Sequence, residues 1–404
     1  MENKIKLDPA GVWKKRVVGM LAGTLTIVSV AQAADIPSRL GYSYYTEQFL
    51  ALVLGLSLAI IFLVSGRSEK SEGSIGAVRM VDWFLSAAGL CLSLYVAAAY
   101  PSLVGRAMSL PWDALIVGSL MFILLLDGLR RAVGWTLVIV VLLIVGYGMI
   151  GHLVPGALQT REVAPPRLAV YLAFDPNGLL GLTLNVAATV VVAFVFFGQL
   201  LLRSGGADFF NDIAMATMGR KRGGAAKISI VASGLFGSIS GVVVSNIVAT
   251  GVVTIRLMVQ SGFRRTTAAA VEAVASTGGQ IAPPVMGAVA FLMADILQKP
   301  YSEIVVAAIV PALLYYVALF VQADLQAAKQ NIKPLDVEDI PAVGSVMSRG
   351  WVFILPFAAI VAALFWFNQR AETAALWGAG AAVLIGLTVG YGKTHMRLAD
   401  LWPA

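Results

Sequence analysis

The sequence predicts an all-α polytopic membrane protein with about ten transmembrane helices, one re-entrant helical hairpin and one discontinuous helix. Apolar residues make up 59% of the 404 residues and charged residues only 13%, against about 25% charged residues in soluble domains. Apolar runs of roughly 20 residues, the length that crosses a bilayer as a helix, recur along the chain. Two stretches of small and polar residues interrupt this pattern in its second half.

Ten segments have the length and apolar content of membrane-crossing helices. In chain order they are residues 15–33, 48–65, 81–100, 113–129, 132–151, 182–203, 266–297, 303–322, 351–368 and 374–391. Basic residues precede the first segment, which ends in "AQAAD". It therefore fits an uncleaved first helix or a secretory signal peptide with Ala31 and Ala33 at its cleavage site. Both alternatives place residue 40 outside.

Basic residues concentrate in alternate connecting segments, which predicts that these segments are cytoplasmic. They are Arg67, Lys70 and Arg79; Arg130 and Arg131; Arg203, Arg220, Lys221, Arg222 and Lys227; Lys329, Lys333 and Arg349; and Lys393 and Arg397. The chain is then a multi-pass protein of a cell inner membrane with a cytoplasmic N-terminus. These loops account for the net charge of +7, so the charge gives no reason to expect a nucleic-acid partner. The apolar composition indicates membrane lipid as the partner.

Residues 228–255 form an apolar stretch that violates this alternation. Basic residues flank it on both sides, ending at Lys227 and resuming at Arg256. A single crossing would invert every later loop, whereas a segment that enters and returns keeps all basic clusters cytoplasmic. We therefore predict a re-entrant hairpin over residues 227–258, with limbs of roughly 13 residues that each reach about 20 Å. Its tip would hold Ser238, Ser240, Gly241, Ser245 and Asn246.

Segment 266–297 is long enough to cross a membrane, but its centre reads "ASTGGQIAPPVMGA" (275–288). Pro283 and Pro284 supply no backbone donors and disfavour helix before them. Non-helical backbone at membrane depth survives only where it is buried in protein or lines a water-filled cavity. Interrupted apolar segments indicate a transporter's binding site, while the alternative is tight helix packing around a kink. Two adjacent polar interruptions favour the site.

Glu272 lies four residues before Ser276, in the limb that leads to this interruption. An acidic residue inside a span indicates a functional group, here a proton carrier, although an ion pair with Arg264 or Arg265 is the structural alternative. The acidic residues at the ends of other spans are expected to be solvated, and these are Asp82, Asp113 and Asp127.

Other kinds of chemistry find little support in the sequence. Cys91 is the single cysteine, which excludes a disulfide framework, and His152 and His395 lie near span ends. A zinc or haem site and Ser-His-Asp chemistry are therefore not expected. The chain also lacks a P-loop pattern, which argues against ATP-driven transport. We expect a protein that is not an enzyme and that holds no cofactor.

Five stretches together resemble the large membrane subunit of TRAP transporters. They are "YLAFDPNGLLG" (171–181), "GGAAKISIVASGLFGSISG" (223–241), "SNIVATGVVTI" (245–255), "EAVASTGGQIAPPVMGAVAFLMA" (272–294) and "AAIVPALLYY" (307–316). The resemblance is strongest to the fused type, in which small and large subunits share one chain and work with TAXI-type binding proteins. It is close over residues 165–325 and weaker in the preceding helices.

This resemblance implies a symporter, a secondary transporter that an ion gradient drives by an elevator mechanism. A periplasmic solute-binding protein of the TAXI type would deliver an organic anion, usually a carboxylate. The first hairpin tip and the first broken helix form half of the family's ion and substrate site. The implied binding residues are Ser238, Ser240, Asn246, Gly251, Ser276, Thr277 and Gly279. The implied Na⁺ ligands are Ser240, Asn246, Ser276 and Thr277, since oxygen ligands suit a hard cation.

The chain departs from the family pattern at Val242, where a small polar residue is usual, and at Arg256, where proline is usual.

We expect small-subunit-like helices in residues 1–165, the first large-subunit repeat in 166–323, a cytoplasmic linker in 324–350, and two membrane helices with a tail in 351–404. No second, inverted repeat is recognisable. The alternative function is therefore a truncated or split fragment that does not transport without a separate second half. A channel is a further alternative, but the spans of this chain lack the rings of charged residues that a channel would be expected to have.

Overall fold

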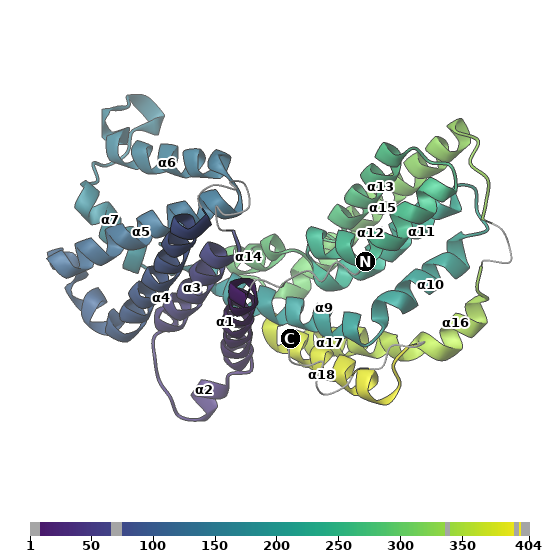
Figure 1. Ribbon diagram of the computed structural model, residues 1–404, viewed down its shortest axis with the longest axis horizontal. Coiled ribbons are helices and arrows are strands. Elements are labelled where there is room, and N and C mark those ends of the chain that lie inside the picture. Colours follow the sequence, from purple (N-terminus) through teal and green to yellow (C-terminus); the bar gives the residue numbers. More distant parts are fainter. Residues whose placement is uncertain (1–8, 66–74, 336–339, 392–395, 397–404) are drawn as a thin grey trace. The chain divides into compact units, whose positions relative to one another are not determined.

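A computed structural model describes residues 9–65, 75–335, 340–391 and 396, and its regular elements are helices (Figure 1). Ten helices within these residues are long and apolar enough to cross a membrane, which confirms the all-α polytopic class. Several predicted features lie outside the described residues. They are Arg67, Lys70, Lys393, Arg397, His395 and, within the predicted linker, residues 336–339.

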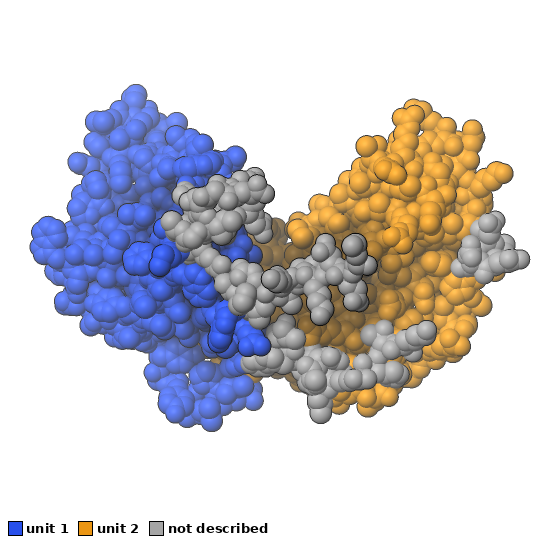
Figure 2. Space-filling model, in the orientation of Figure 1, with its two compact units in different colours: residues 1–31, 36–188, 403–404 blue, residues 32–35, 189–402 orange. Residues whose placement is uncertain are grey.

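The chain divides into two compact units, which Figure 2 colours separately. Unit 1 consists mainly of residues 36–188 and unit 2 mainly of residues 189–402. The division falls inside the predicted span 182–203. This span begins as α8 (Leu182–Val186), widens into a π-helical segment and continues as α9 (Val192–Arg203). The division between the units therefore coincides with a π-helical segment, a kind of turn that is rare and is found mostly at functional positions.

Unit 1 is a helical bundle in which α3 is the most enclosed helix. Its helices are α1 (Pro9–Ala33), α2 (Ile36–Arg39), α3 (Thr46–Val64), α4 (Ile75–Arg106), α5 (Trp112–Ala132), α6 (Trp135–Ile150) and α7 (Pro165–Phe174). Leu50 and Phe62 of α3 are at most 1% exposed and belong to the bundle core. A Cβ on Gly55 would lie 2.5 Å from the Ser93 Cβ, so glycine lets α3 and α4 cross closely.

A buried ion network links the helices of unit 1. Arg131 Nη1 lies 2.5 Å from Asp82 Oδ1, and Arg131 Nε lies 2.8 Å from Asp127 Oδ2. The side chains of Arg131 and Asp82 are 5% and 9% exposed, and the guanidinium lies 5.0 Å above the Phe62 ring. The prediction that Asp82 is solvated was therefore wrong. The aspartate tolerates burial because a cation on α5 neutralises it.

Unit 2 contains the hairpin and the interrupted helix. Its helices after α9 are α10 (Gly206–Met218), α11 (Gly224–Ser240), α12 (Val243–Gln260), α13 (Arg265–Gly278), α14 (Ala288–Leu297), α15 (Tyr301–Lys329), α16 (Val343–Gly350), α17 (Leu355–Phe365) and α18 (Ala371–Thr388). Figure 1 shows α11, α12, α13 and α15 packed side by side. On the other side of the unit, a Cβ on Gly378 of α18 would lie 2.7 Å from Ile360 of α17, so small residues again permit close packing.

Segment 266–297 consists of two helices, as expected of a discontinuous helix, and Val243–Gln260 stands in its place among the ten span-length helices. Other helix bounds differ from the expected ones. The hairpin limbs, α11 and α12, have 17 and 18 residues and are longer than expected. Helix α15 continues to Lys329, into the predicted linker, because Ala323 and Ala327 keep one of its faces buried.

The Arg131 network yields a stability prediction. Arg131→Ala leaves Asp82 buried without its cation, so it should lower the free energy of unfolding of unit 1 by about 3–5 kcal/mol. The control is Arg106→Ala, because Arg106 pairs with Asp113 at the surface, where the side chains are 52% and 37% exposed. The control should cost at most about 1 kcal/mol. Thermal unfolding in detergent measures both, and equal losses would contradict the prediction.

Candidate functional site

The hairpin turns at Gly241 and Val242, between α11 and α12. Gly241 has φ +59°, a left-handed conformation that ends α11, and a Cβ there would lie 2.4 Å from the carbonyl oxygen of Met286. Asn246, which is fully buried at the start of α12, donates from Nδ2 to the carbonyl of Ser233 at 2.8 Å. The amide thus ties the two limbs together just below the turn.

The interruption after α13 lies directly against this turn. A Cβ on Gly279 would lie 2.5 Å from the Gly237 Cα, so the two backbones touch where both residues lack a side chain. Val285 N then donates to the Ser238 carbonyl at 3.0 Å. The two polar interruptions that the sequence shows separately therefore form one structural feature.

Tyrosines of α15 donate hydrogen bonds to backbone carbonyls in and next to the interruption. Tyr315 and Tyr316 donate their hydroxyls to the carbonyls of Val274 and Ala275, at 2.7 and 3.2 Å. Ala275 is one of the last four residues of α13, whose carbonyls have no intrahelical donor, and Val274 directly precedes it. Further along, the Tyr301 hydroxyl donates to the Pro284 carbonyl at 3.0 Å. Side chains of a neighbouring helix thus supply partners that a bilayer does not.

A cluster of hydroxyl groups surrounds the carboxylate of Glu272 in the middle of this assembly. Its Oε1 lies 2.6 Å from the Thr250 hydroxyl and 3.0 Å from that of Ser233. Its Oε2 lies 2.7 Å from the Ser229 hydroxyl. The remaining contacts are with Thr254 on Oε2 and with Ser276 on Oε1, at 3.3 Å. We call Glu272 with Ser229, Ser233, Thr250, Thr254 and Ser276 the Glu272 cluster.

The Glu272 cluster is enclosed, and no basic side chain of the described residues pairs with its carboxylate. Every member is at most 1% exposed. Gly251 makes room for the carboxylate, since a Cβ there would lie 3.2 Å from the Glu272 Cγ. Among the described residues, no lysine, arginine or histidine forms an ion pair with Glu272, so the structural alternative of a pair with Arg264 or Arg265 is not present.

The structure brings most of the predicted binding residues together. Ser276 belongs to the Glu272 cluster, Gly251 and Asn246 adjoin it, and Gly279 forms the contact with the hairpin. Ser240 is buried at the tip, and its hydroxyl has no hydrogen-bond partner among the described residues. Thr277 is exposed and bonds the Ala273 carbonyl of its own helix. Ser238 also bonds its own helix, at the Leu235 carbonyl.

Sequence reasoning missed the other hydroxyl residues of the Glu272 cluster, although the sequence carries a signal for them. Each of three consecutive helices contributes two members four residues apart. The pairs are Ser229 and Ser233, Thr250 and Thr254, and Glu272 and Ser276. Residues four apart share one helix face, so three such faces meeting in one bundle indicate a polar centre.

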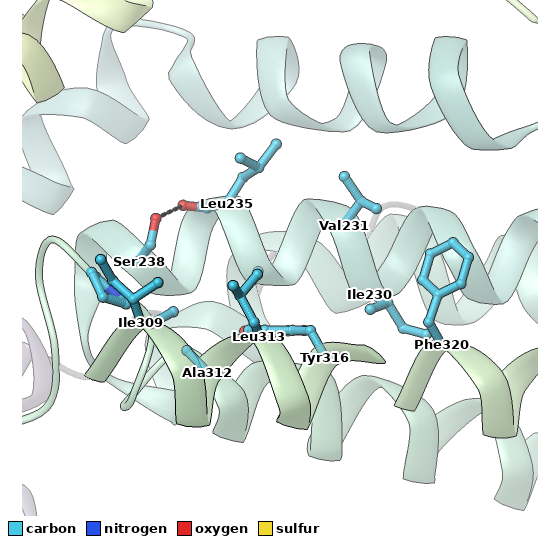
Figure 3. Close-up of a pocket in the computed structure, with 12 residues that line it drawn as sticks. Ile230, Val231, Leu235, Ser238, Ile309, Ala312, Leu313, Tyr316 and Phe320 are labelled. Atoms are coloured by element: carbon cyan, nitrogen blue, oxygen red, sulfur yellow. Dashed lines mark hydrogen bonds between the residues drawn. The ribbon is translucent and has the colours of Figure 1, made fainter. Parts of the chain in front are cut away.

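A groove of about 460 Å³ lies on the other side of α11, between it and α15 (Figure 3). Its lining is apolar apart from the hydroxyls of Ser238 and Tyr316, and no charged side chain lines it. Figure 3 shows that Ser238 is turned back to its own helix. The side chains that line the groove therefore offer an organic anion two hydroxyl groups and no charge partner.

The contact between the hairpin and the interruption yields a prediction. Gly279→Ala should lower the stability of unit 2 by about 1–3 kcal/mol, because its methyl group would overlap the Gly237 backbone, which has no rotamer to change. Gly380→Ala on α18 is the control, since a Cβ there meets nothing within 4 Å. The control should be neutral or stabilising by up to about 1 kcal/mol. Thermal unfolding that ranks the two variants equally would refute the contact.

Comparison with known proteins agrees with the resemblance of the sequence. Residues 119–402 match the family described as the DctM component of the tripartite ATP-independent periplasmic transporter. The chain is 26% identical over 233 residues to the C4-dicarboxylate TRAP transporter large permease protein DctM of Pseudomonas aeruginosa, covering 53% of this chain and 52% of that protein. It is 26% identical over 196 residues to the ectoine/5-hydroxyectoine TRAP transporter large permease protein UehC of Ruegeria pomeroyi, covering 48% and 45%.

The chain thus spans about half the length of the curated relatives it matches. The family match extends over more than half of the chain and includes the hairpin, the interruption and the Glu272 cluster. The chain belongs to the family of DctM components of tripartite ATP-independent periplasmic transporters.

Proposed function

We propose that the chain is the membrane permease component of a TRAP-type secondary transporter in a cell inner membrane, with a cytoplasmic N-terminus. The observation that carries this proposal is the contact between the hairpin tip and the interrupted helix, at Gly237 and Gly279. Transporter sites are built where interrupted membrane helices meet, and here the end of a helical hairpin packs against an interrupted helix. The function is transport, without catalysis.

The transported solute is an organic anion, and we propose a carboxylate. One relative is named for C4-dicarboxylates and the other for ectoine and 5-hydroxyectoine. These names support a small organic solute and differ in its identity. A periplasmic solute-binding protein, which we expect to be of the TAXI type, delivers it to the outer side of the permease.

An ion gradient drives uptake, and we propose Na⁺ as a coupling ion at the hairpin tip. Ser240 supports this assignment best among the candidates, because its buried hydroxyl has no partner among the described residues. Hydroxyl and carbonyl oxygens suit a hard cation. Asn246 and Ser276 are already engaged, with the Ser233 carbonyl and with Glu272. They would act by holding the tip in shape, and Thr277 would have to turn inward to bind an ion.

An elevator motion is compatible with the way unit 2 is held together. The limbs of the hairpin and α13 share the Glu272 cluster, so these helices are bonded to one another by buried hydrogen bonds. We propose that they move as one body during transport. A buried polar network resists separation because each lost bond leaves a polar group unpaired.

Uptake of a labelled C4-dicarboxylate tests the function. The assay would use right-side-out membrane vesicles that contain the chain, its binding protein and any membrane protein that copurifies with it. We expect uptake that requires the binding protein and stops when an ionophore removes the gradient. Asn246→Ala should lower the rate by about tenfold or more, since it removes a buried hydrogen bond worth about 1–3 kcal/mol.

The matched control for this experiment is Thr217→Ala on α10, whose hydroxyl bonds only carbonyls of its own helix. It should leave uptake unchanged. Uptake without the binding protein, or with no gradient, would reject the TRAP-type mechanism. An Asn246→Ala rate equal to that of Thr217→Ala would reject the hairpin tip as part of the site.

A further inference from the structure

Glu272 presents a charge problem that the hairpin and Na⁺ do not solve. An ionised carboxylate inside a membrane bundle is costly unless a cation or enough hydrogen-bond donors compensate it. Glu272 is 0% exposed, and within the described part of the chain its hydrogen-bond partners are hydroxyl groups. Hydroxyls are neutral and can act as donors or as acceptors. The surroundings of Glu272 can therefore serve a carboxylate or a carboxylic acid.

Charged groups on the neighbouring helices are engaged elsewhere or exposed. Lys227 of α11 lies 2.5 Å from Asp324 of α15, which also pairs with Arg222. The tyrosines of α15 donate to backbone carbonyls. The other charged residues of α12, α13 and α15 are exposed, and these are Arg256, Arg264, Arg265, Glu303 and Lys329. None of these groups makes a hydrogen bond or ion pair with the Glu272 carboxylate.

Each threonine of the cluster has the Glu272 carboxylate and a carbonyl of its own helix among its acceptors. Thr254 Oγ1 is within hydrogen-bond distance of Glu272 Oε2 and lies 3.1 Å from the Thr250 carbonyl. Thr250 Oγ1 lies 2.6 Å from Glu272 Oε1 and 2.9 Å from the Asn246 carbonyl. A hydroxyl has one hydrogen, so each threonine can donate to the carboxylate or to its own helix. The choice requires rotation of one hydroxyl and no movement of heavy atoms.

We propose that Glu272 is a proton-binding site and that the transporter carries a proton on it, in addition to the proposed Na⁺. This inference rests on the proposed transport function. On binding, an O–H bond forms at Oε2 as a hydronium ion on the outer side gives up its proton. The new hydroxyl donates to Thr254 Oγ1, and the Thr254 hydrogen turns to the Thr250 carbonyl. Every polar group keeps a partner and the buried charge disappears.

A proton fits this site better than a metal ion does. Four of the five hydroxyl oxygens lie 2.6 to 3.3 Å from the carboxylate oxygens of Glu272. These direct contacts leave no space for a cation between the hydroxyls and the carboxylate. A proton requires no cavity. The described residues also contain no group of three His, Cys, Asp or Glu side chains that could hold a metal ion.

The position of the site links its charge to the packing of the hairpin. Four of the five hydroxyls come from the hairpin limbs, Ser229 and Ser233 on α11 and Thr250 and Thr254 on α12, while Glu272 lies on α13. The hairpin and α13 move as one body during the elevator motion, and a local opening between them at either end of that motion would remove these donors and admit water. The proton would then exchange with the aqueous phase on the side to which the site opens.

Infrared difference spectroscopy across a pH titration tests proton binding without transport. The purified full chain should show the C=O band of a protonated carboxyl group that shifts in D₂O. Glu272→Gln should lack the band, and Glu303→Gln should keep it, because Glu303 is an exposed carboxylate on α15. Spectra of wild type and Glu272→Gln that agree throughout the titration would overturn the proposal.

A second pair of variants keeps the test decisive if Glu272→Gln does not fold. Thr254→Val removes the hydroxyl that accepts the carboxyl proton, so the C=O band should change frequency. Thr254→Ser restores a hydroxyl and should restore the wild-type frequency. A wild-type protein without any protonated-carboxyl band, or a band that both variants leave unchanged, would overturn the proposal.

Transport separates the role of the proton from the function itself. In vesicles with an imposed pH gradient, Glu272→Gln should lower proton-driven uptake about tenfold more than it lowers solute exchange, a ratio typical of coupling between sites. Glu303→Gln should lower neither. Equal losses in both assays would reject the proton as a coupling ion. Absence of uptake in the wild type would reject the proposed function, while the infrared band would still decide whether Glu272 binds a proton.

Discussion

Unit 2 depends on one constraint, that backbone polar groups inside a membrane need partners within the protein. An interrupted helix leaves carbonyls without intrahelical donors, and lipid offers none. The tyrosines of α15 donate to the carbonyls of Val274 and Ala275, and the Ser238 carbonyl of the hairpin accepts from the backbone N–H of Val285 in the interruption. The contact between Gly237 and Gly279 brings the hairpin and the interruption close enough to form the hydrogen bond between Val285 and Ser238. The Glu272 cluster lies behind that contact.

The chain buries acidic side chains in two different ways. In unit 1, Asp82 lies beside Arg131, whose permanent positive charge compensates the carboxylate. In unit 2, the partners of Glu272 among the described residues are hydroxyl groups. A pair with arginine stays ionised because arginine does not lose its proton in proteins. Hydroxyl partners leave the charge state open, so the first arrangement suits a structural support and the second suits a group whose charge changes.

The sequence located both polar interruptions because glycine, proline and hydroxyl residues are conspicuous among apolar residues. It also indicated that Asn246 and Ser276 belong to the same region. It did not show the partners of Glu272, since these depend on how three helices rotate against one another, although the spacing of Ser229 and Ser233 was available. Asp82 was misjudged for a related reason. Its position near a span end suggested water, whereas Arg131 approaches it from another helix. Contacts between elements are what a single sequence shows least.

The tyrosine bonds also bear on how the protein is made. Val274 and Ala275 are synthesised before the residues that bond their carbonyls, which follow 41 residues later. During insertion into the membrane, the interruption therefore has no access to these donors until α15 has emerged from the ribosome. The order of synthesis places the unmet carbonyls first and their partners second. The interrupted helix and α15 thus complete their hydrogen bonding together, as one late step of assembly.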